Sequence, residues 1–329
     1  MRGESMADRE SAFGPDGPAS SESSDGVAVG DGHATDREGS PFRSLLSDRD
    51  PVTERDRIRS FVAERVGAAG ADGVVVNMSG GLDSTVTAAL AVEALGPDRV
   101  YGLILPCNKI GAPHARDAEA LAEALGIEHD TVHLQPLFAQ FGAVVPDRFA
   151  LHDEPVRSGN AVARLRMAVA YLVANATNRL VCGTANRSEL LSGYLTKHGD
   201  GAADLFPLGH LYKTHVRSLA AELDVPEFVV EKSPSAGFLP GQRDADDLGA
   251  PYEVIDPVLH LGVDRGLDPD AVVKRIAAAV TDANVTDAEG GDGEEFAPVD
   301  RELVTDLLGR HRATAHKRLP PPTPDADVE

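Results

Sequence analysis

The sequence predicts an α/β fold in which a doubly wound parallel sheet carries helices on both faces. From about residue 50 onwards, short apolar runs alternate with longer segments of helical periodicity, a pattern typical of strand–helix–strand units. The first apolar run also ends in a glycine-rich loop that opens the next helical segment. Such a loop is expected where parallel strands end beside a ligand.

The elements follow one another in a regular order. The strands are short runs of branched apolar residues, and the helices are longer segments with apolar residues on one side. The expected elements are helix 54–67, strand 74–78, helix 84–95, strand 100–105, helix 114–125, strand 129–134, helix 160–175, strand 180–183 and helix 214–223. Two long connections rich in glycine and proline, 196–207 and 233–251, indicate function or mobility.

The two ends of the chain differ in composition from its middle. Residues 1–45 are expected to form a disordered acidic extension, because branched apolar residues are almost absent there. The folded domain is expected over 46–320, with an acidic, glycine-rich insertion at 282–299 and a disordered tail at 321–329. We find neither a secretory signal nor the run of about 18 apolar residues that a membrane span requires.

The charge balance excludes one class of partner. Lys and Arg number 31 against 53 Asp and Glu, a net charge of −22, so no basic surface is expected for nucleic acid. Only six of the 31 basic residues are lysines, a balance that resembles proteins of salt-accumulating archaea; an ordinary acidic cytosolic protein is the alternative. Cys107 and Cys182 form no C-x-x-C motif and suit a reducing, cytoplasmic setting.

The glycine-rich loop runs from Ser79 to Ser84 as Ser-Gly-Gly-Leu-Asp-Ser. Two adjacent glycines let successive N–H groups converge on one anion, and the following helix adds the unpaired N–H groups of its first turn. The carboxylate of Asp83 fits beside phosphates when a cation such as Mg²⁺ lies between them. The alternative is a Gly-Gly turn with an Asp or Ser helix cap. The chain contains no Gly-Lys-Ser/Thr of a Walker loop.

This loop resembles the pyrophosphate loop of the ATP pyrophosphatases, which adenylate a substrate and release pyrophosphate. That superfamily includes GMP synthetase, asparagine synthetase, argininosuccinate synthetase, NAD synthetase and some tRNA-modifying enzymes. The resemblance implies a Rossmann-like fold of the adenine nucleotide alpha hydrolase type. It implies cleavage of ATP between its α- and β-phosphates and leaves the second substrate open.

A second block of motifs narrows the resemblance. Residues 183–189 read GTANRSE and residues 193–204 read GYLTKHGDGAAD, which together are similar to the pattern of ammonia-dependent NAD synthetases. Further matching motifs cover roughly residues 50–320. They are Gly159-Asn160, Ala163 to Met167, Leu211 to Thr214, Lys232 to Ala236, Gly241-Gln242, Leu248-Gly249 and His316 to Arg318.

The resemblance implies a ligase that works in two steps. Deamido-NAD (nicotinic acid adenine dinucleotide) and ATP give an acyl adenylate and pyrophosphate, and ammonia then displaces AMP to form NAD. Mg²⁺ is the implied cofactor, ATP the co-substrate, and a homodimer the implied assembly. The GMP synthetases, which use XMP, are the rival enzyme class, and an α/β protein that binds ATP without chemistry is the rival from another class.

The resemblance also implies roles for individual residues, each carried over at a matching motif position. The implied ATP-binding residues are Asn77, Met78, Ser79, Gly80, Gly81, Leu82, Asp83, Ser84, Thr184, Lys213 and Ser235. Asp83, Glu189 and Lys213 are the implied catalytic residues, and Asp83 and Glu189 are the implied Mg²⁺ ligands. The implied deamido-NAD residues are Arg164, Lys197, Asp204, His316 and Lys317.

The chain departs from the family pattern at three positions. Ala185 and Arg187 stand where Gly and Lys are usual, and Ser235 stands where Thr is usual but keeps the hydroxyl. Ala185 is expected to keep a negative φ. Some NAD synthetases free ammonia from glutamine with a large amidohydrolase domain and a nucleophilic Cys. Neither cysteine of this chain has a suitable setting, so free ammonia is the expected nitrogen donor.

Overall fold

The computed structural model describes residues 42–107, 111–149, 151, 154–235, 241–286 and 299–324. Its centre is a parallel sheet of four strands, β1 (Gly73–Asn77), β2 (Val100–Ile104), β3 (Glu128–Thr131) and β4 (Arg179–Cys182). The strand order is β3-β2-β1-β4, with Val75 of β1 in register with Tyr101 of β2 on one side. On its other side Val75 is in register with Val181 of β4. The predicted doubly wound parallel sheet is therefore confirmed.

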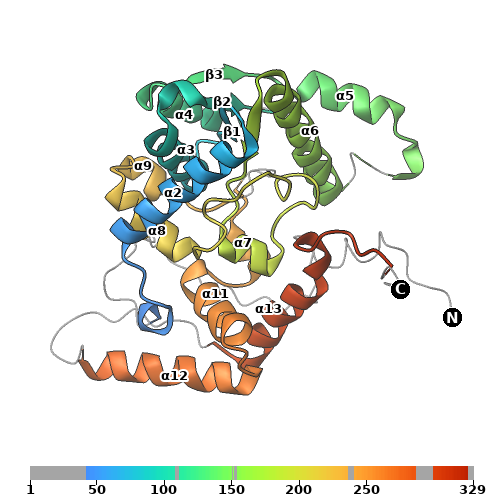
Figure 1. The fold of residues 1–329 in the computed structure, drawn as a ribbon. Helices are drawn as coiled ribbons and strands as arrows, with labels where there is room; N and C mark the ends of the chain where they lie inside the picture. Colours follow the sequence, from blue (N-terminus) through green and yellow to red (C-terminus); the bar gives the residue numbers. More distant parts are fainter. Residues whose placement is uncertain are drawn as a thin grey trace, which may run out of the picture.

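The helices surround this sheet (Figure 1). In chain order they are α2 (Pro51–Ala69), α3 (Leu82–Leu95), α4 (Gly111–Ala124), α5 (Gln135–Val144), α6 (Pro155–Ala176), α7 (Arg187–Ser192), α8 (Lys213–Glu222), α9 (Glu227–Val230), α10 (Asp244–Leu248), α11 (Tyr252–Leu259), α12 (Pro269–Thr286) and α13 (Arg301–Ala313). Short 3₁₀ turns are η1 (Arg43–Leu45), η2 (Pro97–Arg99), η3 (Asp147–Phe149) and η5 (Ala315–Lys317), and η4 (His260–Asp264) is a π-helical turn.

All nine predicted elements are present with the predicted type. The predicted strand 129–134 is shorter in the structure, where β3 ends at Thr131 on the outer edge of the sheet. The predicted helix 160–175 begins five residues earlier, at Pro155, because a proline at the first helical position needs no N–H partner. Helix α5 lies in a segment for which no element was predicted, 135–144.

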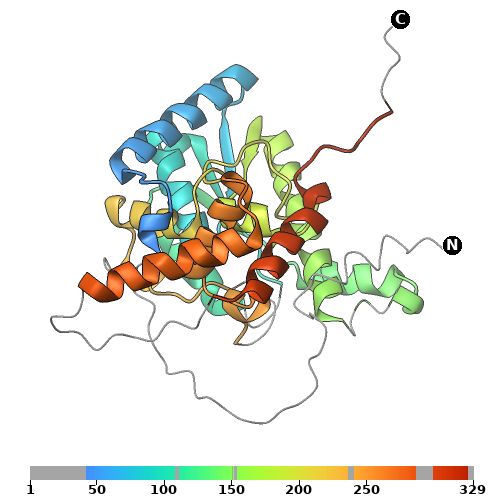
Figure 2. The same ribbon diagram turned by 90° about the horizontal axis from the view of Figure 1, so that it is seen from below.

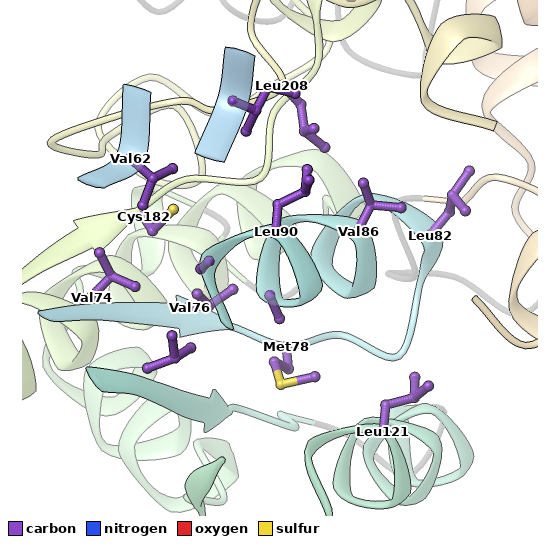
Figure 3. Packing of buried hydrophobic residues seen from close by; sticks show 14 of the residues in the cluster. Val62, Val74, Val76, Met78, Leu82, Val86, Leu90, Leu121, Cys182 and Leu208 are labelled. Carbon is purple, nitrogen blue, oxygen red and sulfur yellow. The ribbon is translucent and has the colours of Figure 1, made fainter. Parts of the chain in front are cut away.

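Two hydrophobic clusters pack on opposite faces of the sheet. On one face, Val74 and Val76 of β1 meet Val86 and Leu90 of α3 together with Leu121 of α4 (Figure 3). On the other face, side chains of the strands pack against α6; this cluster includes Val75, Tyr101, Leu103, Val162 and Ala170. Every second strand residue thus faces the opposite helix layer, as a sheet covered on both faces requires.

A third cluster joins the C-terminal helices α11, α12 and α13, which lie below the sheet region in Figure 1. Ile255, Leu259, Ile276 and Leu307 are almost fully buried in it. Phe42 is 2% exposed and belongs to the same cluster, although the sequence places it in the acidic extension. Residues 1–41, 287–298 and 325–329 lie outside the described residues, so most of the predicted extension, insertion and tail is not described.

The topology fixes the position of the site. The chain passes from β1 towards β2 on one side and later returns to place β4 on the other side of β1. Ligands bind at such a switch point, outside the carboxyl ends of the strands. The loop after β1 and the segment after β4 therefore lie together at one edge of the sheet, as predicted, where Asn186 contacts Asp83. Among the residues that the structure describes, no helix is long and apolar enough to cross a membrane.

Candidate functional site

The loop between β1 and α3 is held by its own serines. The hydroxyl oxygens of Ser79 and Ser84 lie 3.1 Å apart, and the Ser79 N–H donates to Ser84 Oγ at 3.2 Å. Ser84 Oγ in turn donates to the Gly81 carbonyl at 3.0 Å. The two hydroxyls expected to bind phosphate thus lie together at the start of α3, where the positive end of the helix dipole favours an anion.

Gly80 makes the loop possible. Its φ is +72°, and a Cβ at this position would lie 2.5 Å from the carbonyl oxygen of His114 in α4. The Gly80 carbonyl accepts a hydrogen bond of 3.0 Å from Lys232 Nζ, which also pairs with Asp117 of α4 at 2.8 Å. Lys232 therefore ties the loop to α4, in a motif that the sequence analysis singled out without a role.

The centre of the site is a buried lysine between two carboxylates. Lys213, the first residue of α8, has a side chain that is 5% exposed, and its Nζ forms an ion pair with Asp83 of α3. The same Nζ lies 4.0 Å from Oε1 of Glu189 in α7. The three residues predicted to be catalytic are thus brought together from three different helices.

Asn186 joins the two carboxylates. Its amide Nδ2 donates to Asp83 Oδ1 at 3.1 Å, and its Oδ1 accepts from the Glu189 N–H at 3.0 Å. Glu189 Oε2 accepts from the Asn186 N–H at 3.1 Å, which completes a capping box at the start of α7. Glu189 is therefore both a helix-start acid and a neighbour of Lys213, with its second oxygen facing the site.

Negative charge exceeds positive charge around Lys213. Burial raises the pKa of Glu189 well above its usual range, and the charge of Asp83 raises it further. Burial alone would lower the pKa of Lys213, but Asp83 and Glu189 more than offset this and its pKa is raised. Asp244, 4% exposed, adds a third carboxylate whose pKa is raised by burial. One ammonium group does not neutralise three carboxylates, so a divalent cation bound here would bring the charge of the site closer to balance.

The donor set suits Mg²⁺ and not a closed metal site. Among the described residues, no group of three or more His, Cys, Asp or Glu could hold a metal ion. Asp83 and Glu189 offer two carboxylates on either side of Lys213. Mg²⁺ in nucleotide sites is usually bound through one or two carboxylates plus phosphate oxygens and waters.

The other residues predicted to bind ATP have different settings. The side chains of Met78 and Leu82 are 3% and 7% exposed and pack in the core (Figure 3), so only their backbone can reach a ligand. Asn77 ends β1, and its buried Oδ1 has no hydrogen-bond partner among the described residues. Thr184 follows β4 at the same edge of the sheet, and Ser235 is exposed, in the segment after Lys232.

A second group of predicted residues surrounds the loop 193–201. Arg164 of α6 donates from Nε to the Lys197 carbonyl at 3.2 Å. Lys317 of η5 donates from Nζ to the carbonyls of Gly193 and Leu195 at 2.8 and 2.9 Å. Three of the five residues predicted to bind deamido-NAD thus gather from α6, this loop and the C-terminal turn. His316 is the neighbour of Lys317 in the same turn.

Asp204 has a structural contact of its own. Its Oδ2 accepts from the Val181 N–H of the edge strand β4 at 2.7 Å, and its Oδ1 accepts from the Tyr171 hydroxyl at 3.3 Å. The residues around Asp204 continue the sheet, since Leu205 forms a parallel bridge with Cys182. Asp204 therefore closes the edge of the sheet beside the loop that carries Lys197.

Several residues around Lys213 were missed by sequence reasoning. Asn186 could have been found, because an Asn followed by Glu three residues later is the signature of a capping box. Asp244 and Asp256 carry no local signal, since they reach Ser188, Thr214 and the Lys213 region only through the packing of α10 and α11. The expectation for Ala185 is confirmed, because it is not among the non-glycine residues with positive φ in the described structure.

Comparison with known proteins identifies the family. The family model described as NAD synthase matches residues 54–288, which is most of the folded chain. The chain belongs to the NAD synthase family. A relative in this family, the NH(3)-dependent NAD(+) synthetase of Halobacterium salinarum, is 42% identical over 285 residues, covering 87% of this chain and 97% of the relative.

Solved structures of the NAD synthase family have the same fold. An NMN synthetase from Francisella tularensis aligns with 33% identity and a TM-score of 0.67, covering 85% of this chain and all of that one. An NH3-dependent NAD synthetase from Campylobacter jejuni aligns with 25% identity and a TM-score of 0.62, covering 84% of this chain and all of that one. The rival placements, with the GMP synthetases or with non-catalytic ATP-binding proteins, are not favoured.

The geometry of the loop 79–84 predicts that an alanine is tolerated at Gly81 but not at Gly80. Gly80→Ala forces a Cβ against the His114 carbonyl at a positive φ, and we expect a loss of about 2 kcal/mol in the free energy of unfolding. Gly81→Ala is the matched control, because its φ is −102° and its Cβ would meet only Ser79 Oγ at 3.3 Å. Urea denaturation measures both variants. Equal stability of the two would contradict the described packing of Gly80 on α4.

Proposed function

We propose that the chain is a ligase that amidates deamido-NAD with ammonia at the expense of ATP, giving NAD, AMP and pyrophosphate. The observation that carries this proposal is the buried Lys213 between Asp83 and Glu189, directly beside a phosphate-binding loop, in a member of the NAD synthase family. The Halobacterium salinarum relative, an NH(3)-dependent NAD(+) synthetase, supports the same reaction.

In the first step, a carboxylate oxygen of the nicotinate group attacks the α-phosphorus of ATP. The bond from that phosphorus to the bridging oxygen breaks, and pyrophosphate leaves with the electron pair. The loop 79–84 offers its hydroxyls and the first-turn N–H groups of α3 to the leaving group. Lys213 supplies a fixed positive charge where negative charge builds up, which lowers the barrier without reorganisation of the site.

We assign the Mg²⁺ site to Asp83 and Glu189. Bound there, Mg²⁺ would neutralise charge on the pyrophosphate oxygens. The excess of carboxylates around Lys213 supports this assignment. Burial and then the charge of Asp83 raise the pKa of Glu189, and a divalent cation would lower the repulsion between these two carboxylates. Asn186 holds both carboxylates in place, that of Asp83 through its side-chain amide and that of Glu189 through its backbone N–H.

In the second step, ammonia attacks the carbonyl carbon of the acyl adenylate, AMP leaves, and a proton is lost to give the neutral amide of NAD. We infer that free ammonia is the donor. Burial raises the pKa of Cys182 to about 12 and also raises that of Cys107, so neither thiol is activated as a glutaminase nucleophile. Both thiols are free and buried, which also supports a cytoplasmic location.

We assign deamido-NAD to the cations around the loop 193–201. Arg164, Lys197 and Lys317 come together there, and His316 and Asp204 lie next to them in the chain or the fold. Two of these cations are lysines in a chain that has only six. Cationic side chains at this place suit the diphosphate and carboxylate groups of the dinucleotide.

The likeness to a solved NMN synthetase adds one substrate to be tested. NMN is the amide of nicotinic acid mononucleotide, which lacks the adenylate half of deamido-NAD. The same two-step chemistry could amidate either acid, so the contacts to the second half of the dinucleotide decide between them. The 42% identity with an NAD(+) synthetase favours the dinucleotide.

The proposed activity predicts a defined pattern of turnover. With ATP, Mg²⁺ and ammonium, the purified protein should form NAD from deamido-NAD with one AMP and one pyrophosphate each. XMP and nicotinic acid mononucleotide should give no comparable pyrophosphate release, and glutamine should not replace ammonium. EDTA should abolish turnover and added Mg²⁺ restore it. If nicotinic acid mononucleotide is turned over faster than deamido-NAD, the mononucleotide is the substrate. Turnover with glutamine in place of ammonium would refute free ammonia as the nitrogen donor.

The assignment of Glu189 as a metal ligand predicts that its replacement by glutamine lowers kcat strongly. Glu189→Gln keeps the shape of the side chain but removes its charge from the site, and we expect kcat to fall by about 100-fold or more. Glu227→Gln, an exposed carboxylate at the start of α9, is the control and should keep kcat within about twofold. Pyrophosphate release measures both. Unchanged activity of Glu189→Gln would exclude Glu189 as a ligand.

We further propose that the chain forms a homodimer through the outer side of α5 and α6. Of the nine large apolar side chains that are exposed among the described residues, five lie here, on α5, η3 and α6; they are Leu137, Phe141, Val144, Phe149 and Leu172. Both ribbon views show α5 lying outside the main body (Figures 1 and 2), where it packs against α6. Exposed apolar side chains gathered on packed helices in this way suit an interaction site.

The proposed dimer face predicts a change of oligomeric state on charge insertion. Leu172→Asp places a carboxylate on the exposed side of α6, and we expect a monomer at about 10 μM, where the parent chain is a dimer. Phe228→Asp, at an exposed phenyl group of α9, is the control and should stay dimeric. Light scattering after gel filtration gives the mass. A dimer that survives Leu172→Asp would place the interface elsewhere.

A further inference from the structure

Asp256 is a carboxylate with no exposed surface, on α11. Its Oδ1 accepts from the Ser188 hydroxyl at 2.5 Å. Its Oδ2 accepts from both the N–H and the hydroxyl of Thr214, at 3.0 and 2.9 Å. Three donors from two other helices therefore converge on one buried side chain.

The partners of Asp256 are the direct neighbours of the proposed catalytic residues. Ser188 precedes Glu189 in the first turn of α7, and Thr214 follows Lys213 in the first turn of α8. The Lys213 N–H also donates to Ser188 Oγ at 2.8 Å. The carboxylate, the serine hydroxyl and two backbone N–H groups thus form one network that joins the starts of α7 and α8.

We propose that Asp256 is a positioning residue for the reaction. It fixes the first turns of α7 and α8 against each other, so that Glu189 and Lys213 face each other across the site and Lys213 reaches Asp83. Asp256 itself touches neither the reacting atoms nor the Mg²⁺ ligands. This inference rests on the proposed roles of Glu189 and Lys213.

The contacts of Asp256 suit this role because they are short and direct. Backbone N–H groups and β-hydroxyls transmit a displacement of the carboxylate straight to the helix starts, whereas long side chains can absorb it. A displacement of about 1 Å at such a point can cost about 100-fold in rate.

Asp264, about two helical turns after Asp256, also connects the starts of α7 and α8, but through longer and more flexible side chains. It pairs with Arg187 at the start of α7 and accepts from the Tyr212 hydroxyl at 2.8 Å, just before α8. His260 Nδ1 lies 3.1 Å from the same carboxylate. These partners are long side chains, and Asp264 is 21% exposed, so we expect it to tolerate change better than Asp256.

Glu253 provides a matched control for Asp256. It lies one turn earlier on α11 and pairs with Arg217 of α8, whose side chain is 6% exposed. Glu253→Gln therefore weakens a buried connection between the same two helices without touching a neighbour of Glu189 or Lys213. A purely structural role for Asp256 predicts that the two substitutions have similar effects on activity.

The test compares kcat and KM of Asp256→Asn and Glu253→Gln at saturating ATP, Mg²⁺ and ammonium, below the melting temperature of both. The amide of Asp256→Asn must turn an N–H towards Ser188 or Thr214, so one donor loses its acceptor. We expect kcat to fall by about 100-fold with the KM for deamido-NAD within about threefold, and Glu253→Gln to keep kcat within about twofold. Equal kcat values in the two variants would overturn the proposal.

A second variant covers the case in which Asp256→Asn does not fold. Ser188→Ala removes the hydroxyl that joins Asp256 to the Lys213 N–H, and we expect kcat to fall by about tenfold or more at an unchanged KM. Full activity of Ser188→Ala would also overturn the proposal. The assay of Glu189→Gln distinguishes a failure of the proposed function from a failure of the positioning role. If Glu189→Gln is active, the assigned metal site is wrong. If Glu189→Gln is inactive and Asp256→Asn is unaffected, only the positioning role is refuted.

Discussion

The site depends on one buried ammonium group, Lys213 Nζ, held between carboxylates that come from separate helices. A buried lysine is stable only when its charge is compensated, and Asp83 and Glu189 provide that compensation. The same carboxylates repel each other without a cation between them. The interaction therefore links the start of α3, which carries the phosphate loop, to the starts of α7 and α8.

The fold brings these three helix starts together for a topological reason. Strands β1 and β4 are neighbours in the sheet although about 100 residues separate them in the chain. Their carboxyl ends meet at the switch point, so the loop before α3 and the segment before α7 lie side by side. Helix α8 begins with Lys213, which reaches the same place. Asp256 of α11 then binds the start of α8 through the Thr214 N–H.

The sequence predicts the sheet well, because strands buried on both faces leave clear apolar runs such as Val74 to Val76. It also predicts Asp83, Glu189 and Lys213 as site residues, because each lies in a motif, and the structure brings these three side chains together. The contacts of Asn186 with Asp83 and of Lys232 with Gly80 and Asp117 were missed although both residues lie in matched segments, since these contacts depend on which loops meet in space. Asp256 was missed entirely, because an acid in a mostly apolar helix gives no signal of the two helix starts that it joins.

In the proposed arrangement of the site, Asp83 and Glu189 hold the metal ion beside pyrophosphate while Lys213 contacts the phosphates. A crystal structure with α,β-methylene ATP and Mn²⁺ tests it most directly, since anomalous scattering locates the metal ion. We predict one peak bonded to both carboxylates, with Lys213 Nζ in contact with a phosphate oxygen. A metal ion bound to the triphosphate that contacts neither carboxylate would contradict the claim.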